Sequence, residues 1–154
     1  MPRYWLFKSE PNVYSIDDLK RDGRTFWDGV RNYQARNLLR DEIRVGDGVL
    51  YYHSRVDPMA VVGLAKVSEA GAPDPSQFDR RSKYYDDKAT KQTPRWFGVT
   101  VSFDKKFGRP VTLKEMRDIA ALKKMVLLNR SRLSVQPVRA DEWKWIVKRG
   151  QAKG

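Results

Sequence analysis

The chain has 154 residues, 40% of them hydrophobic and 18 of them aromatic (5 Trp, 7 Tyr, 6 Phe), which predicts one folded domain with its own core and argues against disorder outside short segments. It has no cysteine, which excludes disulfide bonds, a thiol nucleophile and a cysteine-type zinc site. The net charge of +12 favours a polyanionic partner, and a nucleic acid in particular, over a basic surface that only aids solubility.

The positive charge is distributed unevenly along the chain. Residues 105–154 contain 14 Lys and Arg against 4 acidic residues, whereas residues 1–104 contain 17 against 15. We therefore expect the C-terminal third to supply most of the basic surface. Composition does not distinguish DNA from RNA.

The sequence shows no membrane or export signal. No apolar run approaches the roughly 20 residues that span a bilayer, and residues 1–11 resemble no signal peptide. We expect no membrane contact and a cytoplasmic protein, in the nucleoid or, in a eukaryote, in the nucleus.

The N-terminal part predicts a strand followed by two helices. Residues 4–9 are aromatic and alternate, with Trp5, Phe7 and Ser9 on one face and Tyr4, Leu6 and Lys8 on the other. Residues 15–21 form a short helix that begins in a near capping box of Ser15 and Asp18. Asn32 caps a second helix, which extends to about Arg40 and points Ala35, Leu38 and Leu39 inward.

The middle of the chain predicts a β-hairpin and a long loop. Residues 45–54 read as a turn and a strand, and residues 59–70 read as a second strand that pairs with it across residues 55–58. Residues 71–95 contain Pro, many charges and no lasting period, so we expect a surface loop.

The last third returns to regular structure. Residues 96–107 alternate strictly, so Phe97, Val99, Val101 and Phe103 face the core and Trp96 faces the other way. The remaining expected elements are a helix over 112–120 that begins in a capping box, a short helical piece over 122–128, a strand over 132–137 ended by Pro137, and a helix over 140–149. This order predicts an α+β fold with a mixed, curled sheet.

Catalysis has little support in the sequence. His53 is the only histidine, so we expect no metal site, and no Gly-rich phosphate motif indicates a cofactor. Ser9 and His53 with Glu10 or Asp28 could form a triad, or the two acids a carboxylate pair, but nothing in the sequence sets their geometry. We expect a protein that is not an enzyme.

Base binding has more support, because a base removed from its stack needs flat apolar faces and polar groups at its edge. The aromatic candidates are Trp27, Tyr33, Tyr51, Tyr52 and Trp96. The polar candidates are Ser9, Asn32, His53 and Ser54, and the phosphate-binding candidates are Lys8, Arg31, Arg130 and Arg132. Each also has a structural interpretation: Trp27 as a core residue, Asn32 as a helix cap, His53 as a partner of the backbone.

Several short motifs of the sequence, in the same order along the chain, resemble motifs of the EVE domain family. They are YWLFKSEP (4–11), WDGVRNYQARNLLR (27–40), YYHS (51–54), GLAKV (63–67), the FD and YYD of the loop (78–86), and RLSVQP (132–137). The resemblance covers about residues 3–148, so residues 1–154 are interpreted as one domain with a basic tail over 149–154. It implies a PUA-like fold, in which a curled mixed sheet forms a small pseudo-barrel surrounded by helices.

The resemblance also implies a function: reading of a modified base, most of all modified cytosine in DNA, by a pocket that accepts a flipped base. Carried over by position, the pocket would comprise Lys8, Ser9, Glu10, Trp27, Val30, Asn32, Tyr33, His53 and Ser54 of the early motifs. Trp96, Arg132 and Ser134 are additions from later in the chain. No nuclease segment is recognisable, so a downstream action would need an effector protein. We expect a monomer. Two alternatives stay open: an RNA-binding domain that reads tRNA or rRNA modifications, and an enzyme that acts on a nucleoside or small ligand through His53 and Glu10.

Overall fold

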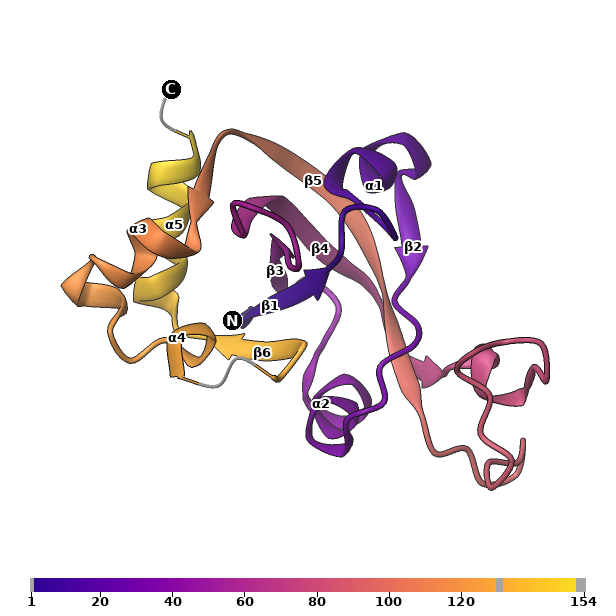
Figure 1. The fold of residues 1–154 in the computed structure, drawn as a ribbon. Helices are drawn as coiled ribbons and strands as arrows, with labels where there is room; N and C mark the ends of the chain where they lie inside the picture. The colour runs from indigo at the N-terminus through magenta and orange to yellow at the C-terminus, as the bar shows by residue number, and fades with distance from the viewer. Residues whose placement is uncertain (1, 130–131, 152–154) are drawn as a thin grey trace.

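The protein folds into one six-stranded sheet with helices around it, in a computed structural model that describes residues 2–129 and 132–151 (Figure 1). The strands are β1 Tyr4–Ser9, β2 Arg24–Phe26, β3 Gly48–His53, β4 Ala60–Pro73, β5 Phe97–Thr112 and β6 Val135–Val138. The α-helices are α1 Ile16–Asp22, α2 Tyr33–Asn37, α3 Leu113–Arg117, α4 Val126–Asn129 and α5 Ala140–Gln151.

The sheet is mixed, as predicted. Its order is β2-β5-β4-β3-β1-β6, and β1 and β3 run parallel whereas the other neighbours run antiparallel. Repeated register shifts along the long β4–β5 pair bend these two strands, because each bulge kinks the strand that contains it. The α+β class and the predicted hairpin of β3 and β4 are confirmed.

Both faces of the sheet are buried, and the alternation in β1 divides its side chains between two hydrophobic clusters. The first core lies on one face and contains Trp5 and Phe7; the second core lies on the other face and contains Leu6. In β3, Tyr51 belongs to the first core and Tyr52 to the second. Neighbouring residues at the end of one strand therefore serve different faces of the molecule.

Local capping signals predicted the helix starts correctly. The Ser15 side chain accepts a hydrogen bond from the Asp18 N–H, and the Asp18 carboxylate accepts one from the Ser15 N–H. The Asn32 Oδ1 accepts from the Ala35 N–H at 3.0 Å. The second helix is wider than expected at its end, because α2 continues into a π-helical turn over Leu38–Glu42 that places Leu39 in the first core.

Three elements differ from the sequence-based expectation. The short strand β2 was not predicted, and it pairs with β5 at one edge of the sheet. The loop after β4 begins only after Pro73 and contains a 3₁₀ turn over Pro75–Phe78. Pro137 lies inside β6 and does not end it, which an edge strand tolerates because one side of its backbone needs no partner.

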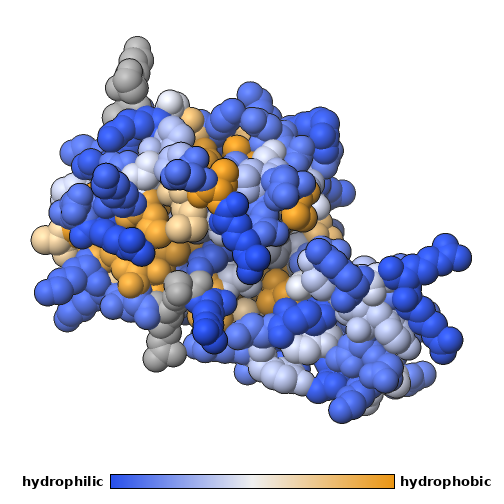
Figure 2. Space-filling view, viewed as in Figure 1, coloured by the Kyte–Doolittle hydropathy of each residue, from blue (hydrophilic) through white to orange (hydrophobic). Residues whose placement is uncertain are grey.

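The C-terminal helices gather on the side of the sheet that carries the second core (Figure 1). Ile146 of α5 and Leu127 of α4 are buried in that core, and Gly150 lets α5 approach Phe107 more closely than a larger residue would. Hydrophilic residues cover most of the face in the space-filling view, and hydrophobic residues reach the surface mainly over these helices and in the middle of the face (Figure 2). Across residues 2–129 and 132–151, no helix is long and apolar enough to cross a membrane.

Candidate functional site

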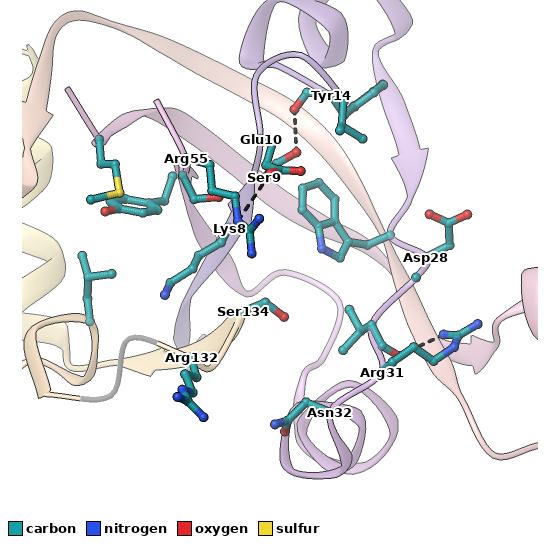
Figure 3. A pocket seen from close by; sticks show the side chains of 18 of the residues that line it. Lys8, Ser9, Glu10, Tyr14, Asp28, Arg31, Asn32, Arg55, Arg132 and Ser134 are labelled. Carbon is teal, nitrogen blue, oxygen red and sulfur yellow. Dashed lines mark hydrogen bonds and ion pairs between the residues drawn. The ribbon is translucent and has the colours of Figure 1, made fainter. Parts of the chain in front are cut away.

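A cleft of about 1210 Å³ opens where the parallel strands β1 and β3 end (Figure 3). Ser9 and His53 are paired at the ends of these strands. Beyond them the chain departs toward α1 on one side and into the turn before β4 on the other. The walls come from the end of β1, the segment between β2 and α2, the β3–β4 turn, Lys83 and Tyr84 of the loop after β4, and side chains within residues 113–129 and 132–134.

The segment between β2 and α2 forms one wall, and a buried carboxylate holds it in place. Gly29 has a φ of +78°, and its N–H donates to Asp74 Oδ2 at 2.8 Å. A Cβ at Gly29 would lie 2.7 Å from the Tyr84 ring, so the loop after β4 approaches this wall as closely as glycine permits. Asp74 also accepts hydrogen bonds from both the N–H and the hydroxyl of Ser76, at 2.8 and 2.6 Å.

Arg31 lies in the same wall, but its donors are occupied. Its five guanidinium hydrogen bonds go to the oxygens of Val30, Asp74, Ser76 and, twice, Tyr84. A guanidinium has only five N–H donors. In this structure the Arg31 side chain joins the wall to the loop after β4, and its role in phosphate binding stays a prediction.

Trp27 is both a core residue and part of the cleft. It is 8% exposed, and its ring contacts Phe7 at 5.3 Å and the edge of Tyr51 at 5.5 Å between centroids. Its remaining surface lines the cleft beside Val30, which is 6% exposed. Protein therefore fixes the orientation of the indole before any ligand arrives.

Asn32 combines the two roles that the sequence left open. Its side-chain oxygen caps α2, as described above. Its amide NH₂ donates no hydrogen bond within the described part of the chain, and the residue lines the cleft. The group that remains for a ligand is thus a donor.

The end of β1 contributes a mixture of charges. The Ser9 hydroxyl donates to the Tyr14 carbonyl at 2.7 Å, and Glu10 forms an ion pair of 3.5 Å with Arg55. Burial lowers the pKa of Lys8. Burial, reinforced by the charge of Asp74, raises the pKa of Asp28 on the opposite wall.

The cleft is basic overall. Among the described residues that line it, the basic side chains are Lys8, Arg31, Arg55, Lys83, Arg117 and Arg132, and the acidic ones are Glu10 and Asp28. Most of these basic residues precede residue 105, so the cleft does not draw its charge mainly from the C-terminal third as expected. Such an excess of positive charge attracts an anionic ligand.

The structure brings most of the predicted residues together. The cleft includes Lys8, Ser9, Glu10, Trp27, Val30, Asn32, Ser54, Arg132 and Ser134, which come from segments far apart in the sequence. Arg130, predicted to bind phosphate, lies outside the described residues.

Three predicted residues do not line the cleft. Tyr33 and Trp96 stack on each other with centroids 4.8 Å apart, and the Trp96 indole N–H donates to Asp86 in the loop after β4. His53 points toward α1, where its Nε2 accepts a hydrogen bond from the Ile16 N–H at 3.1 Å. In this structure each of the three side chains is held outside the cleft by a partner distant in sequence, and their role in base binding stays a prediction.

Sequence reasoning did not assign several residues of the cleft to the base pocket: Asp28, which it considered only as a catalytic acid, and also Arg55, Met59, Tyr84 and Arg117. Asp28 lies within the motif WDGVRN and Arg55 directly follows the motif YYHS, so their neighbours in the sequence could have indicated a place in the cleft. Arg117 had none, since it is one of many basic residues on short helices.

Comparison with known proteins places this chain in one family. Residues 3–149 match the EVE domain, and the chain belongs to that family, as the sequence motifs indicated. An uncharacterized protein of Schizosaccharomyces pombe is 41% identical over 159 residues, which cover 94% of this chain and 66% of that protein. The chain thus spans about two thirds of that relative's length.

Two solved structures are similar over nearly their whole length. A hypothetical protein from Leishmania major has a TM-score of 0.94 and 44% identity, covering 98% of this chain and 96% of that one. Human THYN1 protein in complex with DNA containing 5-methylcytosine has a TM-score of 0.92 and 34% identity, covering 99% of each chain.

Proposed function

We propose that this chain is a DNA-binding module that accommodates a flipped, modified cytosine in the cleft at the ends of β1 and β3. One observation carries the proposal: the fixed indole of Trp27 lies beside Val30 and the available amide donor of Asn32, inside a basic cleft. The human relative whose structure contains 5-methylcytosine DNA has the same fold over its whole length. The module acts without catalysis, as a monomer, and an effector such as a nuclease would act after recognition.

The energetics favour a site that is built in advance. Extruding a base costs a few kcal/mol, and stacking on one aromatic ring returns about 1–3 kcal/mol. Because Phe7 and Tyr51 already hold Trp27, binding needs little further ordering of that side chain.

Discrimination follows from the groups around the base. A methyl group at the 5-position would lie against Val30, while carboxylates such as Asp28 accept from the exocyclic amine of cytosine. The Asn32 amide suits an acceptor at the base edge. Arg55, Arg132 and Lys8 would contact the flanking phosphates, which makes the affinity depend on salt.

The test compares duplexes that contain cytosine, 5-methylcytosine or 5-hydroxymethylcytosine at one position, at two salt concentrations. We expect tighter binding of a modified duplex, and loss of that difference in Trp27→Ala. Trp145→Ala serves as the control, because Trp145 is 42% exposed on α5 and does not line the cleft.

Equal affinity for the three duplexes, unchanged by Trp27→Ala, would remove the flipped-base proposal. An RNA hairpin added as competitor separates the RNA-binding alternative: the DNA proposal requires that it compete less well than the modified duplex.

A further inference from the structure

The cleft is larger than one flipped base requires. Pockets that enclose drug-sized ligands measure roughly 300–1,000 Å³, and this cleft measures about 1210 Å³. The base site proposed above uses only the side formed by the first core, with Trp27 and Val30. The side formed by the second core has a different chemistry.

The pleat of the parallel pair explains why the cleft has two sides. Lys8 of β1 is paired with Tyr52 of β3, one residue before the pair of Ser9 and His53. Successive side chains in a strand point to opposite faces, and Tyr52 belongs to the second core. Lys8 and Tyr52 therefore lie next to each other on the face opposite Trp27.

Tyr52 has an unusual feature for a residue that is only 2% exposed. Among the described residues its hydroxyl makes no hydrogen bond, and it is not one of the fully enclosed polar atoms, so the small exposed part of the residue includes the hydroxyl. The adjacent Tyr51, in contrast, donates to the Tyr14 carbonyl at 2.7 Å. Because Tyr52 lines the cleft, its hydroxyl is available to a ligand that enters there.

Apolar side chains and a guanidinium line the cleft together with Tyr52. Met59 is 37% exposed, and its carbonyl accepts from the Leu113 N–H at 2.8 Å, which joins the β3–β4 turn to the start of α3. Leu127 of α4 also lines this side. Arg117 lines the cleft as well, and its positive charge partly offsets the rise in the pKa of Tyr52 that burial causes.

Basic side chains lie between the two sides. In Figure 3, Lys8, Arg55 and Arg132 lie on one side of Asp28, Arg31 and Asn32, and Glu10 lies beside Arg55, its ion-pair partner. The cleft therefore has an apolar site on each side and positive charge between them. A nucleic-acid strand has the matching order, because a phosphate joins each base to the next.

We propose that Tyr52, Met59, Leu113, Arg117 and Leu127 form a second subsite, which binds the nucleobase adjacent to the modified base on the same strand. The phosphate between the two bases lies among Lys8, Arg55 and Arg132. This Tyr52 subsite rests on the proposed function, and it makes the protein a reader of a two-base step. The Tyr52 hydroxyl can donate or accept, so it selects among neighbouring bases by their edges.

The experiment measures binding of duplexes that contain one 5-methylcytosine, or cytosine in its place, with each of the four bases in turn on its 5′ and its 3′ side. The test variant is Tyr52→Phe, which removes only the hydroxyl and keeps the ring in the second core. Met59→Ala tests the apolar wall at an exposed side chain. Tyr4→Phe is the matched control, since Tyr4 packs against the same core but stacks on Trp143 away from the cleft.

We expect the wild type to prefer one neighbouring base, and Tyr52→Phe to weaken binding of that duplex about threefold to tenfold, the range for one hydrogen bond. The preference for 5-methylcytosine over cytosine should stay unchanged, and Tyr4→Phe should behave like the wild type. Met59→Ala should reduce the neighbour preference in the same direction.

The proposal is overturned if the wild type binds all neighbours equally, or if Tyr52→Phe leaves the neighbour preference intact. Loss of both preferences in Tyr52→Phe would also overturn it, because Tyr52 would then belong to the modified-base site. If cytosine and 5-methylcytosine bind equally while a neighbour preference remains and depends on Tyr52, the modified-base proposal fails and the second subsite stands.

Discussion

Replacing Asp74 tests whether the loop after β4 holds the wall of the cleft. The Asp74 carboxylate is fully buried and accepts from Gly29, Arg31 and, twice, Ser76 at 2.6–3.0 Å. Each buried donor left without a partner costs about 1–3 kcal/mol. Arg31 keeps its bonds to Tyr84 and Val30, so we expect Asp74→Ala to lower the free energy of unfolding by about 3–4 kcal/mol, within the usual range for a broken buried pair.

Urea unfolding at pH 7 measures this loss as a lower midpoint at an unchanged m-value. Asp74→Asn is the matched variant, since it keeps one acceptor oxygen and should lose less. Burial alone would raise the pKa of Asp74, but the hydrogen bonds from Ser76, Gly29 and Arg31 outweigh it and hold the pKa below its usual value. The ionised group therefore stabilises the fold above a pH of about 4, and this contribution disappears as pH falls through the folded-state pKa. A loss below about 1 kcal/mol for Asp74→Ala would refute the reasoning.

Three further predictions concern stability. Burial lowers the pKa of His53, so below about pH 6.5 the unfolded chain binds more protons than the folded one. The Tm of the wild type should therefore fall further between pH 7.5 and pH 5 than the Tm of His53→Gln, and equal falls would contradict this. Gly29→Ala combines the strain of a positive φ with a Cβ 2.7 Å from the Tyr84 ring, whereas in Gly46→Ala, also at positive φ, the Cβ meets nothing within 4 Å. By calorimetry, Gly29→Ala should therefore destabilise the fold more than Gly46→Ala, by about 1 kcal/mol or more. Ser15→Ala removes the capping box of α1 and should cost about 1 kcal/mol in urea unfolding, and an unchanged midpoint would show that the cap contributes nothing.

Sequence patterns predicted the fold wherever the signal was local. Ser15 with Asp18, and Thr112 with Glu115, mark helix starts because a cap needs only residues three positions apart. The alternation in residues 4–9 identified β1 and assigned its side chains to the correct faces. The unpredicted strand β2 has only three residues, and it exists because the edge of β5 is there to pair with it.

The site was less predictable, because partners distant in sequence decide where a side chain points. Trp96 was expected to face away from the core stripe of its strand, yet Asp86 and Tyr33 hold its ring among the residues of the loop. Arg31 read as a phosphate ligand, and nothing local shows that Tyr84, more than 50 positions away, occupies its donors. The charge of the cleft was also hard to predict, because its basic side chains come from several segments of the chain and the composition of one segment does not show which side chains line it.

The two-sided cleft follows from one parallel pair in an otherwise antiparallel sheet. A parallel connection needs a long crossover, and here the chain between β1 and β3 carries Trp27 and Val30 across the first face. The next connection is a short antiparallel turn, which leaves Met59 at the second face, where residues 113–129 cover the sheet. Because β1 and β3 end side by side, successive residues such as Lys8 and Ser9 belong to opposite faces of one opening. The topology that creates the proposed site for one base therefore also creates the space beside it.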